Sequence, residues 1–212
     1  MSQVVNFMAV DPVLQSGALL VGLAVAVIMH EVAHGVMALY LGDPTAKYAG
    51  RLTLNPIKHI DLWGTIIVPL IMLPTGFVFG WAKPVPVNYY NLRGGKYGPF
   101  MVALAGPLTN LALLAIFGFL VRLMPDNTSL PYLFYTIALV NGVLMLFNLI
   151  PIPPLDGSKV LYVFLEHRPD IIQWMERYSI ILLLALIFLG QGLIRLWVIY
   201  PLTILMKFFA GA

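Results

Sequence analysis

The chain has 212 residues, of which 60% are hydrophobic and 10% are charged, so its composition excludes both an ordinary water-soluble domain and a disordered chain. The formal net charge of +3 comes from basic residues scattered between apolar runs, a pattern that predicts membrane-flanking loops and argues against a nucleic-acid partner. Cysteine is absent, which excludes disulfides and thiolate ligands and leaves histidine and carboxylate to hold any metal ion.

The first apolar run covers residues 14–41, and after Ser16 it is interrupted only by His30, Glu31 and His34. It lacks a basic leader and is much longer than the apolar core of a signal peptide, so we expect a retained transmembrane helix. The polar stretch that follows contains an alternation of polar and apolar side chains over residues 47–54, which is typical of a β-strand.

A second extended segment is expected at residues 83–88, where two prolines exclude a helix. Together with residues 47–54 it predicts a small membrane-associated β-hairpin or sheet. An exposed edge of that sheet would hold an unwound substrate by strand addition. The alternative is a self-paired sheet that only lines the site.

The apolar run at residues 62–81 is broken by prolines and a glycine. Most basic residues stand before residue 100 or after residue 150, whereas Arg122 is the only one in the connection between residues 122 and 131. The positive-inside rule therefore places both ends of residues 62–81 in the cytoplasm. This predicts a re-entrant segment; the alternative is a fourth simple transmembrane helix.

Residues 100–124 and 132–150 predict two further transmembrane helices, the second of which ends abruptly at a proline-rich stretch. An amphipathic segment at residues 156–177 precedes another predicted span at residues 179–196, and a last apolar stretch surrounds Pro201.

The sequence thus predicts an all-α polytopic membrane protein with about four to five transmembrane helices, a small β-hairpin or sheet and a re-entrant segment. It is expected to be one membrane-embedded domain over residues 1–212, with a core at residues 14–166 and C-terminal helices at residues 178–210.

The first run contains an H-E-x-x-H motif, His-Glu-Val-Ala-His, at residues 30–34. Two histidines four residues apart share one helix face, as a common zinc ion requires, and Glu31 lies beside them, where it can take a proton from water. The alternative is a polar contact between helices. Ionisable side chains inside a membrane cost on the order of 3 kcal/mol each, which favours a metal site.

Asp156 is the best candidate for a third ligand, because prolines hold the preceding chain extended and Gly157 allows a close backbone approach. The alternative is that Asp156 caps the following helix. Spacing alone does not choose between these roles. The histidines and Asp156 can meet only if residues 62–81 do not cross the membrane, and the positive-inside rule requires the same topology. We therefore expect the site on the cytoplasmic side.

The sequence resembles the site-2 proteases, which are intramembrane zinc metalloproteases, and specifically their small bacterial type without a PDZ or CBS domain. The resemblance rests on H-E-V-A-H at residues 30–34, G-W-A-K-P-V-P-V-N at residues 80–88, A-G-P-L-T-N at residues 105–110 and N-L-I-P-I-P-P-L-D-G at residues 148–157.

This resemblance implies that His30, His34 and Asp156 bind one Zn²⁺ per chain and that Glu31 is the general base. It also implies that Asn148 acts in substrate handling near the site. The implied activity is regulated intramembrane proteolysis of a single-pass membrane protein, performed by a multi-pass protein of the cell membrane.

Other interpretations rest on fewer residues. Asn110, four residues after Gly106, either supports a ligand or the oxyanion or belongs to a tightly packed helix face. His59 is expected to be structural or interfacial. The alternative function is a zinc- or proton-handling membrane transporter, because buried ionisable residues also mark ion paths.

Overall fold

In a computed structural model the chain is described over residues 11–72, 82–125 and 129–211, and every regular element in these ranges is helical. Four helical stretches are long and apolar enough to cross a membrane: α1 (Pro12–Tyr40), α4 (Tyr97–Leu123), α5 (Leu130–Asn148) and the continuous stretch Gln191–Ala210. The described residues therefore form a multi-pass α-helical membrane protein, as predicted.

Shorter helices connect or flank these spans. They are α2 (Thr45–Tyr48), the 3₁₀ helices η2 (Pro56–His59) and η5 (Tyr89–Asn91), the π-helical η3 (Leu62–Ile67), α3 (Val68–Met72), α6 (Gly157–Phe164), α7 (Pro169–Arg177) and α8 (Ser179–Leu189). The stretch Gln191–Ala210 consists of α9 (Gln191–Ile194), the π-helical η6 (Arg195–Ile199) and α10 (Tyr200–Ala210).

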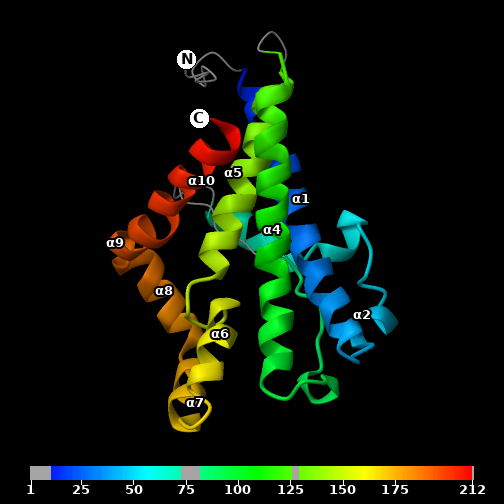
Figure 1. Cartoon of the computed structure of the whole chain (residues 1–212), viewed down its shortest axis with the longest axis vertical. Coiled ribbons are helices and arrows are strands. Elements are labelled where there is room, and N and C mark those ends of the chain that lie inside the picture. The colour runs from blue at the N-terminus through cyan, green and yellow to red at the C-terminus, as the bar shows by residue number, and fades with distance from the viewer. Residues whose placement is uncertain (1–10, 73–81, 126–128, 212) are drawn as a thin grey trace.

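Helices α1, α4 and α5 pack against one another and form the centre of the molecule (Figure 1). Their contacts are lined by small residues: Ala26 and Ala138 are fully buried, and a side chain at Gly22 would touch the backbone of α5. Small residues allow helix backbones to approach closely, which is how helices associate in lipid. The close approach lets short side chains from different helices meet in the interior.

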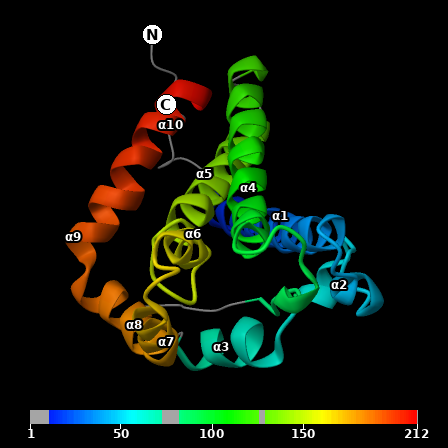
Figure 2. The ribbon, with the colours of Figure 1, turned by 60° about the horizontal axis from the view of Figure 1, so that its bottom comes forward.

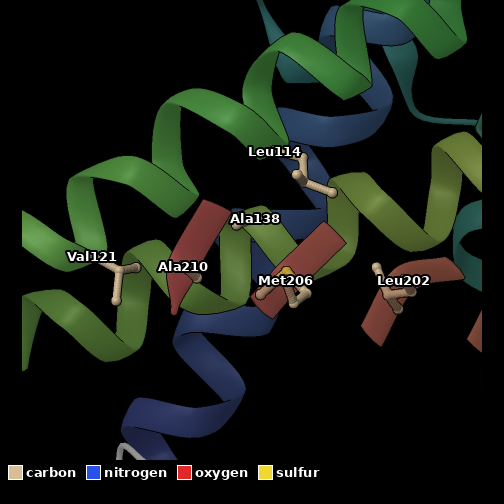
Figure 3. Close-up of a cluster of buried hydrophobic side chains, with 6 residues drawn as sticks. All are labelled: Leu114, Val121, Ala138, Leu202, Met206 and Ala210. Carbon is tan, nitrogen blue, oxygen red and sulfur yellow. The ribbon is translucent and has the colours of Figure 1, made fainter. Parts of the chain in front are cut away.

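Helix α10 packs on the outer side of the α4–α5 pair. Its side chains Leu202, Met206 and Ala210 join Leu114 and Val121 of α4 in one buried cluster, which Ala138 of α5 completes (Figure 3). In Figure 2, α8, α9 and α10 follow one another along this flank of the bundle.

The predicted span at residues 179–196 is wrong in its boundaries. Helix α8 ends at Leu189, and a continuous stretch that is long and apolar enough to span begins at Gln191. Helices α7 and α8 are long and apolar enough only together, as a pair bent by 69°, which would be a broken span or a re-entrant loop. Gly190 forms the break, with its N–H turned back to the carbonyls of Ala185 and Leu186. Pro201 does not end the last helix; it stands directly after the π-helical η6, within the continuous stretch Gln191–Ala210.

The predicted β-hairpin or sheet is also wrong for the described residues, which contain no strand. The alternation at residues 47–54 does not produce a strand, because the end of α2, a turn at residues 49–50 and a bend at residues 52–53 lie in this stretch. Residues 83–88 form neither a helix nor a strand, and Asn88 is extended; Pro84 and Pro86 carry no N–H, so this segment cannot form a regular ladder. Its contacts are single hydrogen bonds to side chains and turns.

The chain between α1 and α4 leaves and returns at the same end of α1. The N–H of Arg93, four residues before α4, donates to the carbonyl of Leu41, directly after α1 (2.8 Å). Helix α4 consequently runs antiparallel to α1 (Figure 1), and the intervening chain makes no net crossing. The predicted re-entrant run at residues 62–81 begins with η3 and α3, and its remainder, residues 73–81, lies outside the described residues.

Candidate metal centre

Helix α1 supplies two imidazoles that face one another. His30 and His34, one turn apart, place their Nε2 atoms 2.9 Å from each other, and their rings stand nearly perpendicular at 89°. His30 is buried and His34 is partly buried. The four-residue spacing thus produces the shared helix face that the sequence predicts.

Asp156 meets both histidines from the other side of the bundle. Its Oδ2 lies 3.1 Å from Nε2 of His30 and 3.3 Å from Nε2 of His34. Asp156 precedes α6, but its side chain makes no capping hydrogen bond, so the capping alternative is wrong. A side chain at Gly157 would collide with the carbonyls of Leu149 and Ile150, which shows how tightly this turn folds onto the end of α5.

Hydrogen bonds to the outer nitrogens determine where each histidine carries its proton. His34 Nδ1 lies 2.7 Å from the carbonyl of Val102, which can only accept, so His34 Nδ1 is the donor. His30 Nδ1 lies 2.6 Å from Oδ1 of Asn110 and donates to it. Both Nε2 atoms therefore present lone pairs to the space between them and Asp156.

The three inward-facing atoms fit a cation. The ligand atoms of His30, His34 and Asp156 lie within 4.8 Å of one another, and the buried Oδ2 of Asp156 has no hydrogen-bond donor. Three acceptors that converge in a buried space repel one another unless a positive charge lies between them. Two imidazoles and one carboxylate form a typical donor set for catalytic zinc, which keeps a fourth position open.

Gly106 of α4 provides the space for this group. A Cβ atom there would lie 2.6 Å from His34 Nε2 and 2.7 Å from His30 Nε2, inside the group of ligand atoms. The small residue predicted to favour helix packing therefore also forms one wall of the metal site.

Glu31 is held by the extended segment. Its Oε2 accepts a hydrogen bond from the N–H of Val85 (2.8 Å). Val85 stands between Pro84 and Pro86, so its N–H is the only backbone donor of the three residues. The segment can approach α1 because Gly35 has no side chain; a Cβ there would lie 2.9 Å from Val85 Cγ1.

Two buried side chains hold this segment in place. Asp43, directly beyond α1, accepts hydrogen bonds from the N–H of Asn88 (2.7 Å), from the Asn91 side chain (3.0 Å) and from Thr45. Burial disfavours the charged carboxylate, but these hydrogen bonds outweigh it and hold the pKa of Asp43 below its usual value. Arg51, also buried, donates to the carbonyl of Lys83 (2.5 Å).

The structure also shows the contacts of three further residues that the sequence singles out: Asn110, Asn148 and His59. Asn110 contacts His30, which supports the prediction that it backs a ligand. Asn148 donates to the carbonyl of Leu144 on its own helix (3.0 Å), and its role in substrate handling stays a prediction. His59 is buried, and its Nε2 donates to the carbonyl of Thr53 (2.8 Å), a structural contact.

Sequence reasoning missed two groups near the site. Asn141 of α5 contacts Asn110, and the Val85 N–H contacts Glu31. Asn141 is a polar residue within the apolar helix α5, which indicates a buried hydrogen bond. Val85 has the only N–H among three consecutive residues, which indicates that this N–H has a specific partner.

Comparison with known proteins gives one family and several relatives. The family described as "Peptidase family M50" matches residues 124–189. Several relatives carry the name "Putative zinc metalloprotease", among them the following three. YwhC of Bacillus subtilis is 40% identical over 190 residues, which cover 84% of this chain and 84% of that protein. Rip2 of Mycobacterium tuberculosis is 28% identical over 166 residues, which cover 76% of this chain and 62% of that protein.

The third relative, MJ0611 of Methanocaldococcus jannaschii, is 43% identical over 137 residues, which cover 63% of each chain. No solved structure matches the chain.

Proposed function

The chain belongs to peptidase family M50, the site-2 protease family, and we propose that it hydrolyses peptide bonds within or near the transmembrane segments of membrane-protein substrates. It is a multi-pass membrane metalloprotease, and zinc is its cofactor. The transporter alternative loses its support, because the relatives are named as metalloproteases.

The observation that carries the proposal is the convergence of three acceptor atoms beside Glu31. We assign His30, His34 and Asp156 as the ligands of one zinc ion. Zinc, when bound, supplies Lewis-acid polarisation of the peptide carbonyl and lowers the pKa of water. The hydrogen bonds from His30 to Asn110 and from His34 to Val102 hold the two rings in the orientation that binding requires.

Glu31 is assigned as the group that moves the proton. The Val85 N–H donates to Oε2, and we assign the other oxygen, Oε1, as the one that takes a proton from water and later delivers it to the departing peptide nitrogen. The hydrogen bond also fixes the carboxylate relative to α1, so the base does not have to be oriented again in each cycle.

The depth of the site favours a substrate that lies in the membrane. At a rise of about 1.5 Å per residue, His30 lies roughly 15 Å before the end of α1 at Tyr40, inside a helix long enough to span. A peptide bond that reaches this depth belongs to a segment within or near the bilayer. A helix hides its peptide bonds, so we infer that the substrate unwinds before it is cleaved.

Regulated intramembrane proteolysis of a single-pass protein is the corresponding biological activity. The basic residues before α4 and after α5 favour a site on the cytoplasmic side of the cell membrane.

The proposal is tested with the full chain reconstituted in liposomes and two sets of peptides. One set consists of single-pass transmembrane peptides, and the other consists of water-soluble peptides of the same length. We expect mass spectrometry to find cleavage within or next to the transmembrane segments by the wild type, and at least a hundredfold less by Glu31→Gln. The zinc content of Glu31→Gln should equal that of the wild type, because Glu31 is not assigned as a ligand.

Equal cleavage by the wild type and Glu31→Gln would overturn the role of Glu31. Cleavage of the soluble peptides alone would overturn the substrate class. A normal zinc content in Asp156→Ala would refute the third ligand.

A further inference from the structure

The ligand His30 is the first member of a buried chain of side-chain hydrogen bonds. His30 Nδ1 donates to Oδ1 of Asn110 (2.6 Å), and Asn110 Nδ2 donates to Oδ1 of Asn141 (2.8 Å). Asn141 Nδ2 in turn donates to the carbonyl of Ile137 (2.8 Å). Both asparagines are fully buried, so water does not compete for these hydrogen bonds.

The chain of hydrogen bonds fixes the orientation of each amide. The carbonyl of Ile137 can only accept, so Asn141 must turn its Nδ2 toward Ile137 and its Oδ1 toward Asn110. Asn110 then meets two acceptors, Asn141 Oδ1 and the carbonyl of Ala26 (3.1 Å), with the two hydrogens of its Nδ2. Its Oδ1 is left facing His30, which must carry its proton on Nδ1.

The consequence reaches the metal site, because a histidine with its proton on Nδ1 has a free lone pair on Nε2. If the Asn110 amide were reversed, Nδ2 would face His30, the proton would move to Nε2, and this nitrogen could no longer bind a metal ion. The reversed amide would also place Oδ1 against two acceptors, the Ala26 carbonyl and Asn141 Oδ1. Without Asn141 only one of these opposing contacts remains.

His34 offers an internal comparison. Its Nδ1 donates directly to the backbone carbonyl of Val102, which cannot be reversed in the way an amide side chain can. One ligand histidine is therefore oriented by the backbone and the other by a relay of two side chains. Only the second depends on a residue as far from the metal site as Asn141.

We propose that Asn141 is a positioning residue, which fixes the Asn110 amide and through it the proton of His30, so that Nε2 of His30 is ready to bind zinc. This inference rests on the proposed function, since it requires His30 to be a zinc ligand. Asn141 itself does not touch the ligand group; it acts from α5, whereas His30 and Asn110 belong to α1 and α4. The hydrogen bonds from His30 to Asn110 and from Asn110 to Asn141 thus connect all three central helices, α1, α4 and α5, to the site.

The test is the zinc affinity of the purified full chain in detergent micelles. Metal-free protein is titrated with zinc in competition with a chromophoric chelator. Asn141→Leu, which keeps the size but removes both polar groups, should bind zinc about tenfold more weakly than the wild type. This is the lower end of the roughly 10- to 100-fold loss that is usual when a ligand loses its direct hydrogen-bond partner, because the Ala26 carbonyl still opposes the reversed amide.

Asn141→Asp is the conservative variant and should restore binding to within a few-fold of the wild type. A buried carboxyl group keeps its proton, so its O–H donates to the Ile137 carbonyl and its C=O accepts from Asn110, as the amide does. Thr136→Val is the matched control on the same helix. Thr136 is buried and donates to the Tyr132 carbonyl of its own helix, so its loss should leave zinc affinity unchanged.

Thermal unfolding of the metal-free proteins identifies any variant that loses zinc through loss of fold, and Asn141→Ala replaces Asn141→Leu if the latter does not fold. Equal zinc affinity of the wild type and the apolar variants would overturn the inference and leave the proposed function standing. Equal weakening by Asn141→Asp and by the apolar variant would also overturn it, because the role would then be packing. A wild type that binds no zinc would overturn the proposed function itself.

Discussion

At the residue scale, the proposed metal site depends on two glycines as well as on its candidate ligands. Gly106 faces both histidines proposed as ligands, and Gly157 allows Asp156 to turn from the end of α5 toward them. The sequence predicts the three ligand candidates correctly as neighbours, because H-E-x-x-H fixes a spacing on one helix and the L-D-G stretch resembles a known family. It does not predict that Gly106 lines the site, since contacts between helices depend on their register.

Gly106→Ala should therefore abolish zinc binding. The added methyl group would lie 2.6 Å from His34 Nε2, far closer than a carbon and a nitrogen can approach, so the histidines or α4 must move. We expect the zinc content of the purified variant, measured by mass spectrometry, to fall at least tenfold.

Gly17→Ala is the matched control for this variant. A Cβ atom at Gly17 of α1 meets nothing within 4 Å, so this change should leave the zinc content as in the wild type. Full zinc occupancy in Gly106→Ala would show that the α1–α4 contact differs from the one described above.

At the element scale, the segment between α1 and α4 is where sequence and structure differ most. The prolines at positions 84 and 86 correctly exclude a helix, but the alternation at residues 47–54 wrongly predicts a strand. A strand requires a partner ladder, and alternation in a short stretch does not reveal whether one exists. The segment is held by buried polar side chains, Asp43 and Arg51, whose partners are distant in sequence and could not be predicted from it.

The hydrogen bonds to Asp43 should make stability depend on pH. They hold its pKa below the unfolded value of about 4, so the stabilisation is complete above that value and is lost as the pH falls through the folded pKa. Asp43→Asn removes the charged acceptor and should cost about 2 kcal/mol at pH 7. Thermal unfolding in detergent should show a gap between the wild type and Asp43→Asn at pH 7 that closes below about pH 4.

Asp170→Asn is the control for this measurement. Asp170 is exposed and paired with Arg168 at the surface, where an ion pair contributes little to stability. Its unfolding curves should follow those of the wild type across the pH range. A gap between the wild type and Asp43→Asn that stayed constant from pH 7 to pH 3 would contradict the ionised, hydrogen-bonded state of Asp43.

At the scale of the whole molecule, the direction of the central helices explains how the site assembles. Helices α1 and α5 run one way and α4 runs the other, so the later turns of α1, the first turns of α4 and the chain after α5 meet at one level (Figure 1). The sequence predicts this arrangement from charge, since both ends of residues 62–81 carry basic residues. The predicted span at residues 179–196 overlooks the break at Gly190, although Gly190-Gln191-Gly192 interrupts the apolar run there and glycine is a poor residue for a helix interior.

At the opposite end of the molecule, the basic residue Arg122 connects two helices. Arg122, at the end of α4, donates to the carbonyls of Lys207 and Phe208 in the last turn of α10. A cation at a helix C-terminus satisfies carbonyl groups that lack a partner within the helix. Arg122 is thus accounted for by packing between spans, so it does not weaken the assignment of this end to the outer side.

The orientation can be tested directly, because the chain contains no cysteine and therefore gives no background in thiol labelling. Ser129, between α4 and α5, and Gln173, on α7, are both exposed and lie on opposite sides of the proposed topology. In intact cells, a membrane-impermeant maleimide should label Ser129→Cys but not Gln173→Cys, and permeabilisation should make the second position reactive. The reverse pattern would place the metal site on the outer side, because Asp156 and α7 both follow α5 without an intervening span.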